Sequence, residues 1–347
     1  MFIHYPSLAL LGIAHALALA SIPYMHFHGI HASEAIFHLT AMLAGGFGIT
    51  ALYHRAWAHN AVLLARPVEY VLALLSVFML QMPARQWIST HLRHHQHTDH
   101  DDDPYNIQRG FWWAHFKWII FAPVPPVEVP ARLADNPVVF WQERYYWPLS
   151  ILLNVAIPIL LSVAVGAPWW GGVLLSVLRL VVTSHAIFGV NSVCHVWGSR
   201  PFTRDVSARD VWWFPFVLGE QYHNYHHAFP RDYRHGVDRF AFDPTKWLIN
   251  LLARVGLARN LVAMPEIRVR EARQRVLSSQ QQMRPHENGA VDSLEYLLVD
   301  LRHSLGRHSG PPGMTADDSM SAETALSLLS LVVAIRRRRC DLWAASD

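Results

Sequence analysis

The sequence is poor in cysteine and in charged residues. Its 347 residues include two cysteines, Cys194 and Cys340, which lie far apart and outside any CxxC pair. Neither a disulfide framework nor a thiolate metal site is therefore expected. Charged residues make up 16% of the chain and hydrophobic residues 52%, whereas soluble domains carry roughly 25% charged residues. This composition is typical of a membrane protein with large polar parts.

Several familiar signals are also missing. The net charge is +3 and no basic stripe is interleaved with aromatics, so nucleic acid is not an expected partner. No Lys or Arg precedes Arg55, so a cleavable signal peptide with a charged start is not expected. The stretch GFGITA, from Gly46, superficially fits a dinucleotide fingerprint. It lies inside an apolar run with no preceding strand, which favours close helix packing instead.

Long apolar runs are what the sequence does contain. A bilayer is crossed by about 20 apolar residues, and four runs reach that length. They are residues 7–26, 34–53, 147–166 and 169–190. The connector inside each pair of runs lacks Lys and Arg, whereas 55–146 and the segment after 198 are rich in Arg. The positive-inside rule then places both hairpin tips outside and both charged segments in the cytoplasm.

We therefore predict an all-α membrane protein with four transmembrane helices and a cytosolic helical cap. The cap is expected to comprise residues 54–146 and 191–270, so that residues 1–270 form one membrane domain. Residues 271–347 are predicted to be a polar, partly disordered C-terminal tail with a short amphipathic basic segment.

Two features of the apolar runs need a separate interpretation. A fifth run, residues 67–83, would put later segments on the wrong side if it crossed the bilayer. We interpret it as an interfacial or re-entrant helix, with a fifth span as the alternative. Arg179 falls inside the fourth run. A charge within the membrane indicates function by default, but the sequence does not identify its partner.

Histidine is abundant, with 23 residues, and it is clustered. The motifs HRAWAH, HLRHH, NSVCH and HNYHH contain His54, His59, His91, His94, His95, His195, His223, His226 and His227. In HxxHH the three histidines share one face of a helix. In HxxxxH the two histidines are about 140° apart on a regular helix, so they reach one centre only if the helix ends or tilts between them.

The number of clustered histidines predicts more than one metal ion. Four ligands usually satisfy zinc, whereas nine imidazoles would suit two ions of higher coordination number. Nitrogen-rich ligation without thiolate is compatible with iron, copper or zinc, and the membrane setting favours iron. Asn191, four residues before His195, lies on the same helical face. The isolated His15, His38, His115 and His185 are expected to be packing or capping residues.

Longer segments around these motifs resemble a known family, the membrane-bound acyl-CoA desaturases of the stearoyl-CoA Δ9 type. The resemblance is colinear over about residues 10–265. It includes HRAWAHNAV, QWISTHLRHHQHTDHDDDPYN, RGFWWAHFKW, FWQERYYWP and GEQYHNYHHAFPRDYR. It implies a four-span fold whose cap holds two iron ions. By position, one iron would be bound by His54, His59, His91, His95 and His226, and the other by His94, His195, His223, His227 and, through a water, Asn191.

The resemblance also implies an activity. An O2-dependent diiron fatty acyl desaturase introduces a cis double bond, here expected at Δ9, into a saturated acyl chain, and the metal cofactor carries this chemistry. Zinc could replace iron in overexpressed protein. Trp57, Trp87 and Trp118 lie near the histidine motifs and are expected to line the substrate tunnel, with ordinary packing as the alternative. The enzyme is expected to be a multi-pass protein of a bacterial inner membrane, with its active site on the cytoplasmic face.

The identity of the partners is less specific. Residues 119–130, IIFAPVPPVEVP, lack the basic run that meets the CoA phosphates in animal members of the family. Both acyl-CoA and acyl-lipid therefore stay open as substrates. No HPGG-type haem motif is visible, so the electrons are expected from a separate ferredoxin, rubredoxin or cytochrome b5-like protein.

Two other functions stay open at this stage. The same metal scaffold could hydroxylate or decarboxylate a fatty acid. A membrane metal-binding or transport protein without redox chemistry is less favoured, because transporters place their ligands at broken helices in mid-membrane.

Overall fold

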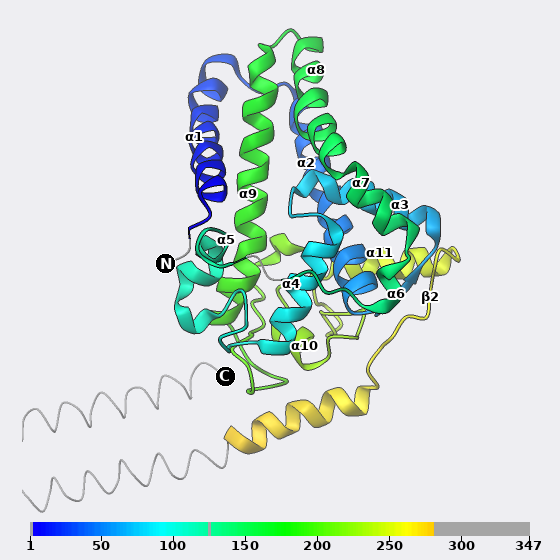
Figure 1. Ribbon diagram of the computed structural model, residues 1–347. Helices are drawn as coiled ribbons and strands as arrows, with labels where there is room; N and C mark the ends of the chain where they lie inside the picture. Colours follow the sequence, from blue (N-terminus) through cyan, green and yellow to red (C-terminus); the bar gives the residue numbers. More distant parts are fainter. Residues whose placement is uncertain (1–2, 124–125, 281–347) are drawn as a thin grey trace, which may run out of the picture. The chain divides into compact units, whose positions relative to one another are not determined.

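The computed structural model describes residues 3–123 and 126–280 (Figure 1). The chain divides into a compact unit, Met1–Arg273, and a second unit, Gln274–Asp347. In the second unit the structure describes residues 274–280, which are helical. Most of the predicted C-terminal tail, including its basic segment, lies outside the described residues.

Four helices of the first unit are long and apolar enough to cross a membrane. They are α1 (Tyr5–His28), α2 (Ala32–Phe47) continued by η1 (Gly48–Ala58), α7 (Pro137–Ile151) continued by η5 (Leu152–Ala156) and α8 (Ile157–Ala164), and α9 (Trp169–Val196). Large apolar side chains such as Leu10 and Ile13 are exposed on them, as expected of surfaces that face lipid. The predicted fold class, an all-helical membrane protein with four spans, is confirmed.

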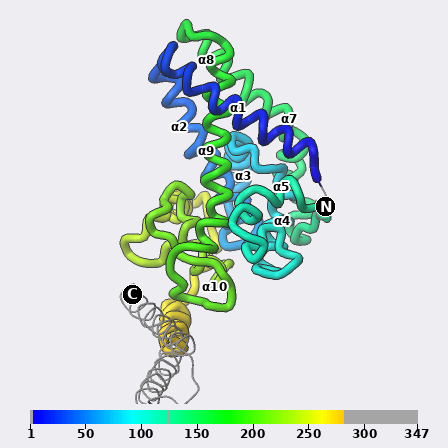
Figure 2. Tube along the Cα trace, turned by 90° about the vertical axis from the view of Figure 1, so that its left-hand side faces the viewer, coloured from blue at the N-terminus to red at the C-terminus, as the bar shows by residue number. Residues whose placement is uncertain are grey.

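The spans form a bundle in which α9 is central. Helices α1 and α8 both pack against α9, and two perpendicular views show α1 running beside it (Figures 1 and 2). The remaining elements gather at one end of the bundle. Because the four long helices extend beyond the apolar runs, this region comprises residues 59–136 and 197–273 where the sequence predicted 54–146 and 191–270, and it is called the cap below. Its elements are β1 (Leu63–Leu64), α3 (Arg66–Ser76), η2 (Val77–Met79), α4 (Ala84–His97), η3 (Ile107–Arg109), η4 (Trp113–Lys117), α5 (Trp118–Phe121), α6 (Ala131–Ala134), η6 (Pro215–Val217), α10 (His223–Ala228), α11 (Pro244–Arg254) and β2 (Ala258–Arg259).

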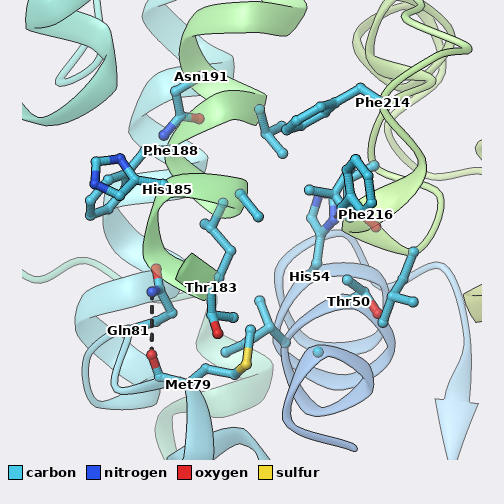
Figure 3. A pocket seen from close by; sticks show the side chains of 18 of the residues that line it. Thr50, His54, Met79, Gln81, Thr183, His185, Phe188, Asn191, Phe214 and Phe216 are labelled. Atoms are coloured by element: carbon cyan, nitrogen blue, oxygen red, sulfur yellow. Dashed lines mark hydrogen bonds and ion pairs between the residues drawn. The ribbon is translucent and has the colours of Figure 1, made fainter. Parts of the chain in front are cut away.

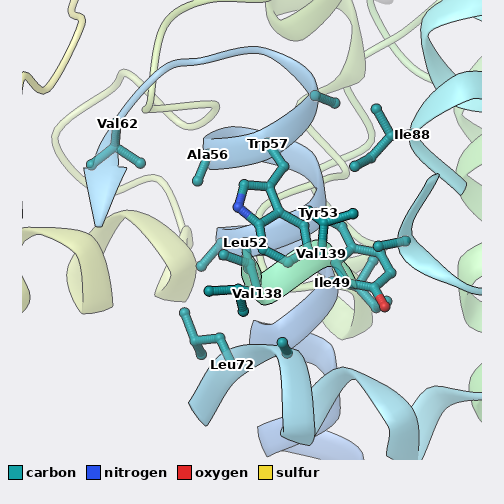
Figure 4. Close-up of a cluster of buried hydrophobic side chains, with 14 of the residues drawn as sticks. Ile49, Leu52, Tyr53, Ala56, Trp57, Val62, Leu72, Ile88, Val138 and Val139 are labelled. Atoms are coloured by element: carbon teal, nitrogen blue, oxygen red, sulfur yellow. The ribbon is translucent and has the colours of Figure 1, made fainter. Parts of the chain in front are cut away.

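The largest apolar core lies where the second span enters the cap. It surrounds η1, and Tyr53 and Trp57 stack within it with ring centroids 5.6 Å apart (Figure 4). Val138 and Val139 of α7 and Leu72 of α3 complete the contacts drawn there. This packing fixes the position of η1, because buried side chains of this size interdigitate with little free volume.

The fifth apolar run, residues 67–83, ends at a sharp bend of the chain. Helices α3 and η2 end at Met79, and α4 leaves at an angle of 80°. The backbone carbonyl groups at the C-terminal end of α3 and η2 lie inside the protein, and two side chains from the spans donate hydrogen bonds to them. Asn154 Nδ2 donates to Val77 O at 3.2 Å, and Arg179 Nη1 donates to Phe78 O at 2.6 Å. A helix C-terminus carries partial negative charge, so it provides one partner of Arg179 that the sequence did not identify. Asn154 Oδ1, which accepts from Arg179 Nη2 at 2.5 Å, provides another.

Candidate metal centre

The nine clustered histidines gather into two sets in which one nitrogen from each residue lies within 4.8 Å of the others. The first cluster consists of His54, His59, His91, His95 and His226. The second cluster consists of His94, His195, His223 and His227. The structure therefore brings together every histidine singled out from the motifs, and it divides them as the family resemblance implied.

Hydrogen bonds between the rings do not account for the first cluster. His226 Nε2 lies 3.0 Å from His54 Nε2 and 2.8 Å from His95 Nε2. A ring nitrogen of neutral histidine either donates one proton or accepts with one lone pair, so it cannot satisfy several such neighbours. His59 Nε2 and His91 Nε2 are 2.7 Å apart in the same cluster. Lone pairs that converge in this way fit a metal cation at their common centre.

The second cluster has the same character. His223 Nε2 lies 3.1 Å from His195 Nε2 and 3.1 Å from His227 Nε2. His94 Nε2 lies 3.3 Å from His227 Nε2. The two clusters are neighbours, since the rings of His95 and His227 stack with centroids 4.3 Å apart. A pair of metal ions with adjacent coordination shells would fit this donor set.

Helices α4 and α10 each contribute to both clusters. On α4, His91 and His95 join the first cluster and His94 the second. Residues at i and i+4 lie one above the other, while i+3 projects to the other side of the same face. On α10, the short HNYHH helix, His226 joins the first cluster and His223 the second. Two HxxHH helices facing each other therefore form the walls between which both clusters lie.

The HxxxxH pair reaches one centre because the helix there is not a regular α-helix. Residues Gly48–Ala58 form a π-helix, and the His59 N–H donates to His54 O at 3.0 Å. This is the i+5 hydrogen bond of a π-helix, a form that often occurs at functional sites. It brings residues five apart to the same side of the helix, so His54 and His59 both face the first cluster.

Side chains outside the clusters hold three of the rings by their Nδ1 atoms. His54 Nδ1 lies 2.6 Å from Glu220 Oε2, and His94 Nδ1 lies 2.8 Å from Asp103 Oδ1. His195 Nδ1 lies 2.6 Å from Ser207 Oγ, which donates to an Asp99 carboxylate oxygen at 2.5 Å. A proton on Nδ1 leaves the lone pair on Nε2, which points into the cluster. Such contacts fix the tautomer of a metal-binding histidine.

Glu220 is itself held by a buried network. Arg55 donates to both carboxylate oxygens of Asp243, at 3.0 and 3.1 Å, and to Glu220 Oε1 at 3.3 Å. His235 Nδ1 lies 3.3 Å from Glu220 Oε2, so His54, Glu220 and His235 form a third close group. Burial alone would raise the pKa of the Glu220 carboxyl, but His235 and His54 hold that pKa well below its usual range. The carboxylate therefore stays ionised and keeps His54 oriented.

The protonation state of the cluster suits metal binding. Burial, followed by the charges of neighbouring rings, lowers the pKa of His59, His91 and His95 well below the usual value. The same causes lower the pKa of His223 and His226. These rings are therefore neutral near pH 7, and neutral imidazole is the form that binds a metal.

A cavity of about 860 Å³ opens beside the two clusters. His54, His91 and His223 lie in its wall, and the rest of the lining is mainly apolar. Figure 3 shows side chains from α9, among them Thr183 and Asn191, facing His54 and Thr50 of η1 across it. A volume of this size is that of a small-molecule binding site.

The aromatic residues predicted to line a tunnel lie in different places. Trp87 and Trp118 line the cavity, and Trp87 stacks on His91 with centroids 4.9 Å apart. Trp57 instead lies in the apolar core, where its Nε1 donates to Glu69 Oε1 at 3.1 Å. Asn191 lines the cavity one turn before His195. Glu220, which the sequence analysis did not single out, lines it as well.

Comparison with known proteins agrees with this geometry. The fatty acid desaturase family model matches residues 33–248. A probable acyl-CoA desaturase of Schizosaccharomyces pombe is 36% identical over 262 residues, which is 73% of this chain and 55% of that protein. An sn-2 palmitoyl-lipid 9-desaturase of Nostoc sp. is 36% identical over 264 residues, which is 73% of this chain and 88% of that protein.

A third relative, acyl-CoA desaturase 1 of Saccharomyces cerevisiae, is 32% identical over 277 residues, 78% of this chain and 54% of that protein. The chain thus spans about half the length of the two yeast relatives. It belongs to the fatty acid desaturase family, and the resemblance drawn from its motifs is confirmed.

Proposed function

We propose that the protein is an O2-dependent diiron fatty acyl desaturase that introduces a cis double bond, at Δ9, into a saturated acyl chain. The observation that carries this proposal is the position of the two histidine clusters, which meet the wall of an apolar cavity. The names of the relatives, which include acyl-CoA desaturases and a lipid 9-desaturase, support the reaction and the bond position.

The first cluster would hold one iron ion and the second cluster the other. Asn191, on the cavity wall, would complete the second site through a bound water. Iron is preferred over zinc because hydrogen removal from an unactivated methylene needs a redox-active metal, and no side chain provides that chemistry. When bound, the iron pair would use O2 and two electrons to supply the oxidising power for the reaction.

The protein's own side chains position the substrate. Trp87 is held against His91, and Trp118 packs edge-on against Tyr105 with centroids 4.7 Å apart. Rigid aromatic walls of this kind restrict where a flexible acyl chain lies, and positioning of this kind contributes strongly to rate. The apolar lining also excludes water, which protects reactive species from side reactions.

The location and partners follow from charge and chemistry. Lys and Arg are concentrated in the cap segments rather than in the span connectors, which supports an active site on the cytoplasmic face of the membrane. The proposed membrane is a bacterial inner membrane. The two electrons for each turnover would come from a ferredoxin, rubredoxin or cytochrome b5-like protein that docks on the cap. The substrate is a fatty acyl chain carried by CoA or by a lipid.

Product analysis tests the proposal. Iron-loaded protein in lipid nanodiscs would be incubated with stearoyl substrates, O2 and a reductant, and the extracted chains analysed by mass spectrometry. We expect a cis-9 alkene that is absent when O2 is withheld. A hydroxy acid without an internal alkene would indicate hydroxylation instead of desaturation. A terminal alkene without an internal alkene would indicate decarboxylation. Metal transport by the protein reconstituted in sealed vesicles, without O2 consumption, would instead favour the non-redox alternative.

A further inference from the structure

The cavity wall is thin where α2 faces α9. Leu43 of α2 and Val182 of α9 line the cavity, although these residues are 49% and 53% exposed. Both lie near the middle of spans that are long and apolar enough to cross a bilayer. One side chain therefore separates the cavity from the hydrocarbon core of the membrane at this level. We call the part of the cavity wall contributed by the partly exposed Leu43, Val182 and Phe216 the seam.

A short loop closes the end of the seam nearest the cap. Residues 214–218, called the strap, contain η6 and rest on glycines of both spans. A Cβ at Gly189 of α9 would lie 2.6 Å from the Phe214 ring, and one at Gly46 of α2 would lie 2.7 Å from a Leu218 methyl. Neither contact leaves room for a side chain on the helix. Phe216, between these two anchors, lines the cavity and is 75% exposed.

The charges of the lining argue against a polyphosphate carrier inside the cavity. None of the described residues that line it is Lys or Arg, and Glu220 is its one carboxylate among them. Phosphate groups are usually bound by Arg or Lys. A hydrocarbon tail needs no such partner. A tail that passes directly from the bilayer to an apolar cavity is never exposed to water. Exposure to water would cost about 0.8 kcal/mol for each CH₂ of the tail.

We propose that the seam is a lateral portal through which the acyl tail of a bilayer lipid enters the cavity, with the strap as its edge nearest the cap. This inference rests on the proposed function, because it names the source of that function's substrate. A chain esterified to a lipid stays attached to a headgroup at the membrane surface. It therefore enters sideways through a slot between two spans rather than end-on through the cap.

Photo-crosslinking tests the portal without requiring turnover. The protein would be reconstituted in nanodiscs that contain a phosphatidylglycerol with a diazirine near the methyl end of one acyl chain. After irradiation, peptide mass spectrometry would locate the label. In the wild type we expect labelling of Thr50 and Met79, which are buried and line the cavity.

Filling the seam should remove this internal label. Val182→Trp is expected to reduce labelling of Thr50 and Met79 on the order of tenfold, because a bulkier side chain occupies the narrow gap. The matched control is Leu160→Trp on α8, a residue that is 65% exposed and does not line the cavity. Its internal labelling should equal that of the wild type. Leu43→Trp, on the opposite side of the seam, provides a second blocking variant if the first fails to fold.

The outcomes separate the portal from the proposed function. Equal internal labelling in the wild type and in both blocking variants overturns the portal. The portal is also overturned if the diazirine acyl chain labels internal residues as a CoA thioester but not as the phospholipid, since the tail then arrives from water. Product analysis on the same samples is independent. Internal labelling without an alkene product leaves the portal and removes the proposed function, whereas an alkene product without internal lipid labelling removes the portal alone.

Discussion

The protein contains two groups of histidines whose arrangements contrast. In the two clusters beside the cavity, a nitrogen such as His226 Nε2 faces several other nitrogens at about the same distance. A second group runs as a chain between α1, α9 and η4. His15 Nε2 lies 2.9 Å from His185 Nε2, and His185 Nδ1 lies 2.9 Å from His115 Nε2. In the chain each nitrogen has one partner.

The ends of the chain are also satisfied. His15 Nδ1 donates to Leu11 O at 2.6 Å, and His115 Nδ1 lies 2.8 Å from Ser192 Oγ. Such links join helices in a membrane, where polar side chains bond one another. The contrast shows that histidine density alone does not identify a metal site. Convergence of several nitrogens on one point does, because pairwise hydrogen bonds cannot satisfy it.

The largest effect is expected from removing a clustered ring. His223→Ala should abolish turnover and reduce bound metal from about two ions to about one per chain, because the second cluster loses a ligand. Product analysis and elemental analysis measure the two effects. His100→Ala, an exposed histidine beyond the end of α4, is the control and should retain both. An active His223→Ala variant would contradict the ligand assignment.

The second largest effect is expected from removing the metal ions. A chelator is expected to lower the free energy of unfolding of the wild type by about 3–4 kcal/mol, as for loss of a ligand present at 100–1,000 times its dissociation constant. Thermal unfolding in detergent, with and without added iron, measures this. An unchanged unfolding temperature would mean that the converging nitrogens bind no ion.

A smaller effect is expected at the carboxylate that holds His54. Glu220→Gln should weaken metal binding by about 10–100-fold, the usual cost of removing a partner of a metal-binding histidine. Competition with a chelator of known affinity measures it. Glu266→Gln, an exposed carboxylate paired with Arg270, is the matched control. Equal affinities in the two variants would show that Glu220 does not orient the cluster.

The smallest effect belongs to the histidine chain. His15→Leu should cost about 0.6 kcal/mol of stability, the average for a polar contact between membrane helices, and leave the metal content unchanged. His26→Leu, exposed on the same helix, should have no effect on either. Metal loss in His15→Leu would show that the chain and the clusters are not separate systems.

The general architecture could be predicted because it depends on simple periodicities. Apolar runs of sufficient length locate the spans, and the spacing of HxxHH puts three rings on one helical face. The HxxxxH spacing indicated that a regular helix would not bring His54 and His59 to one centre, but nothing from Gly48 to Ala58 predicted a π-helix rather than a helix end or a tilt. The direction in which His59 points depends on the larger number of residues per turn in the π-helix.

The partners of the buried polar groups were also beyond the sequence. Asp103 and Glu220 lie close in the chain to histidine motifs, and that proximity was a usable signal, but their pairing with His94 and His54 depends on the fold. Arg179 illustrates the same point. Its partners include the backbone carbonyl of Phe78 and Asn154 Oδ1 of the neighbouring span, and no sequence pattern encodes either contact.

Helix α2 continues into η1 without a break, so the cavity wall and the metal-site histidine lie at a fixed spacing along one helix. Gly46, Ile49 and Thr50 line the cavity, and His54 follows in the same helix without an intervening loop. Under the proposed function, the depth available to an acyl chain and the carbon held beside the clusters are therefore set together. Deleting one residue between Gly48 and His54 would rotate the two parts relative to each other, by less than the roughly 100° per residue of a regular α-helix because η1 is a wider π-helix. Under the proposed function, side-chain size along this helix rather than its length would then set the bond position.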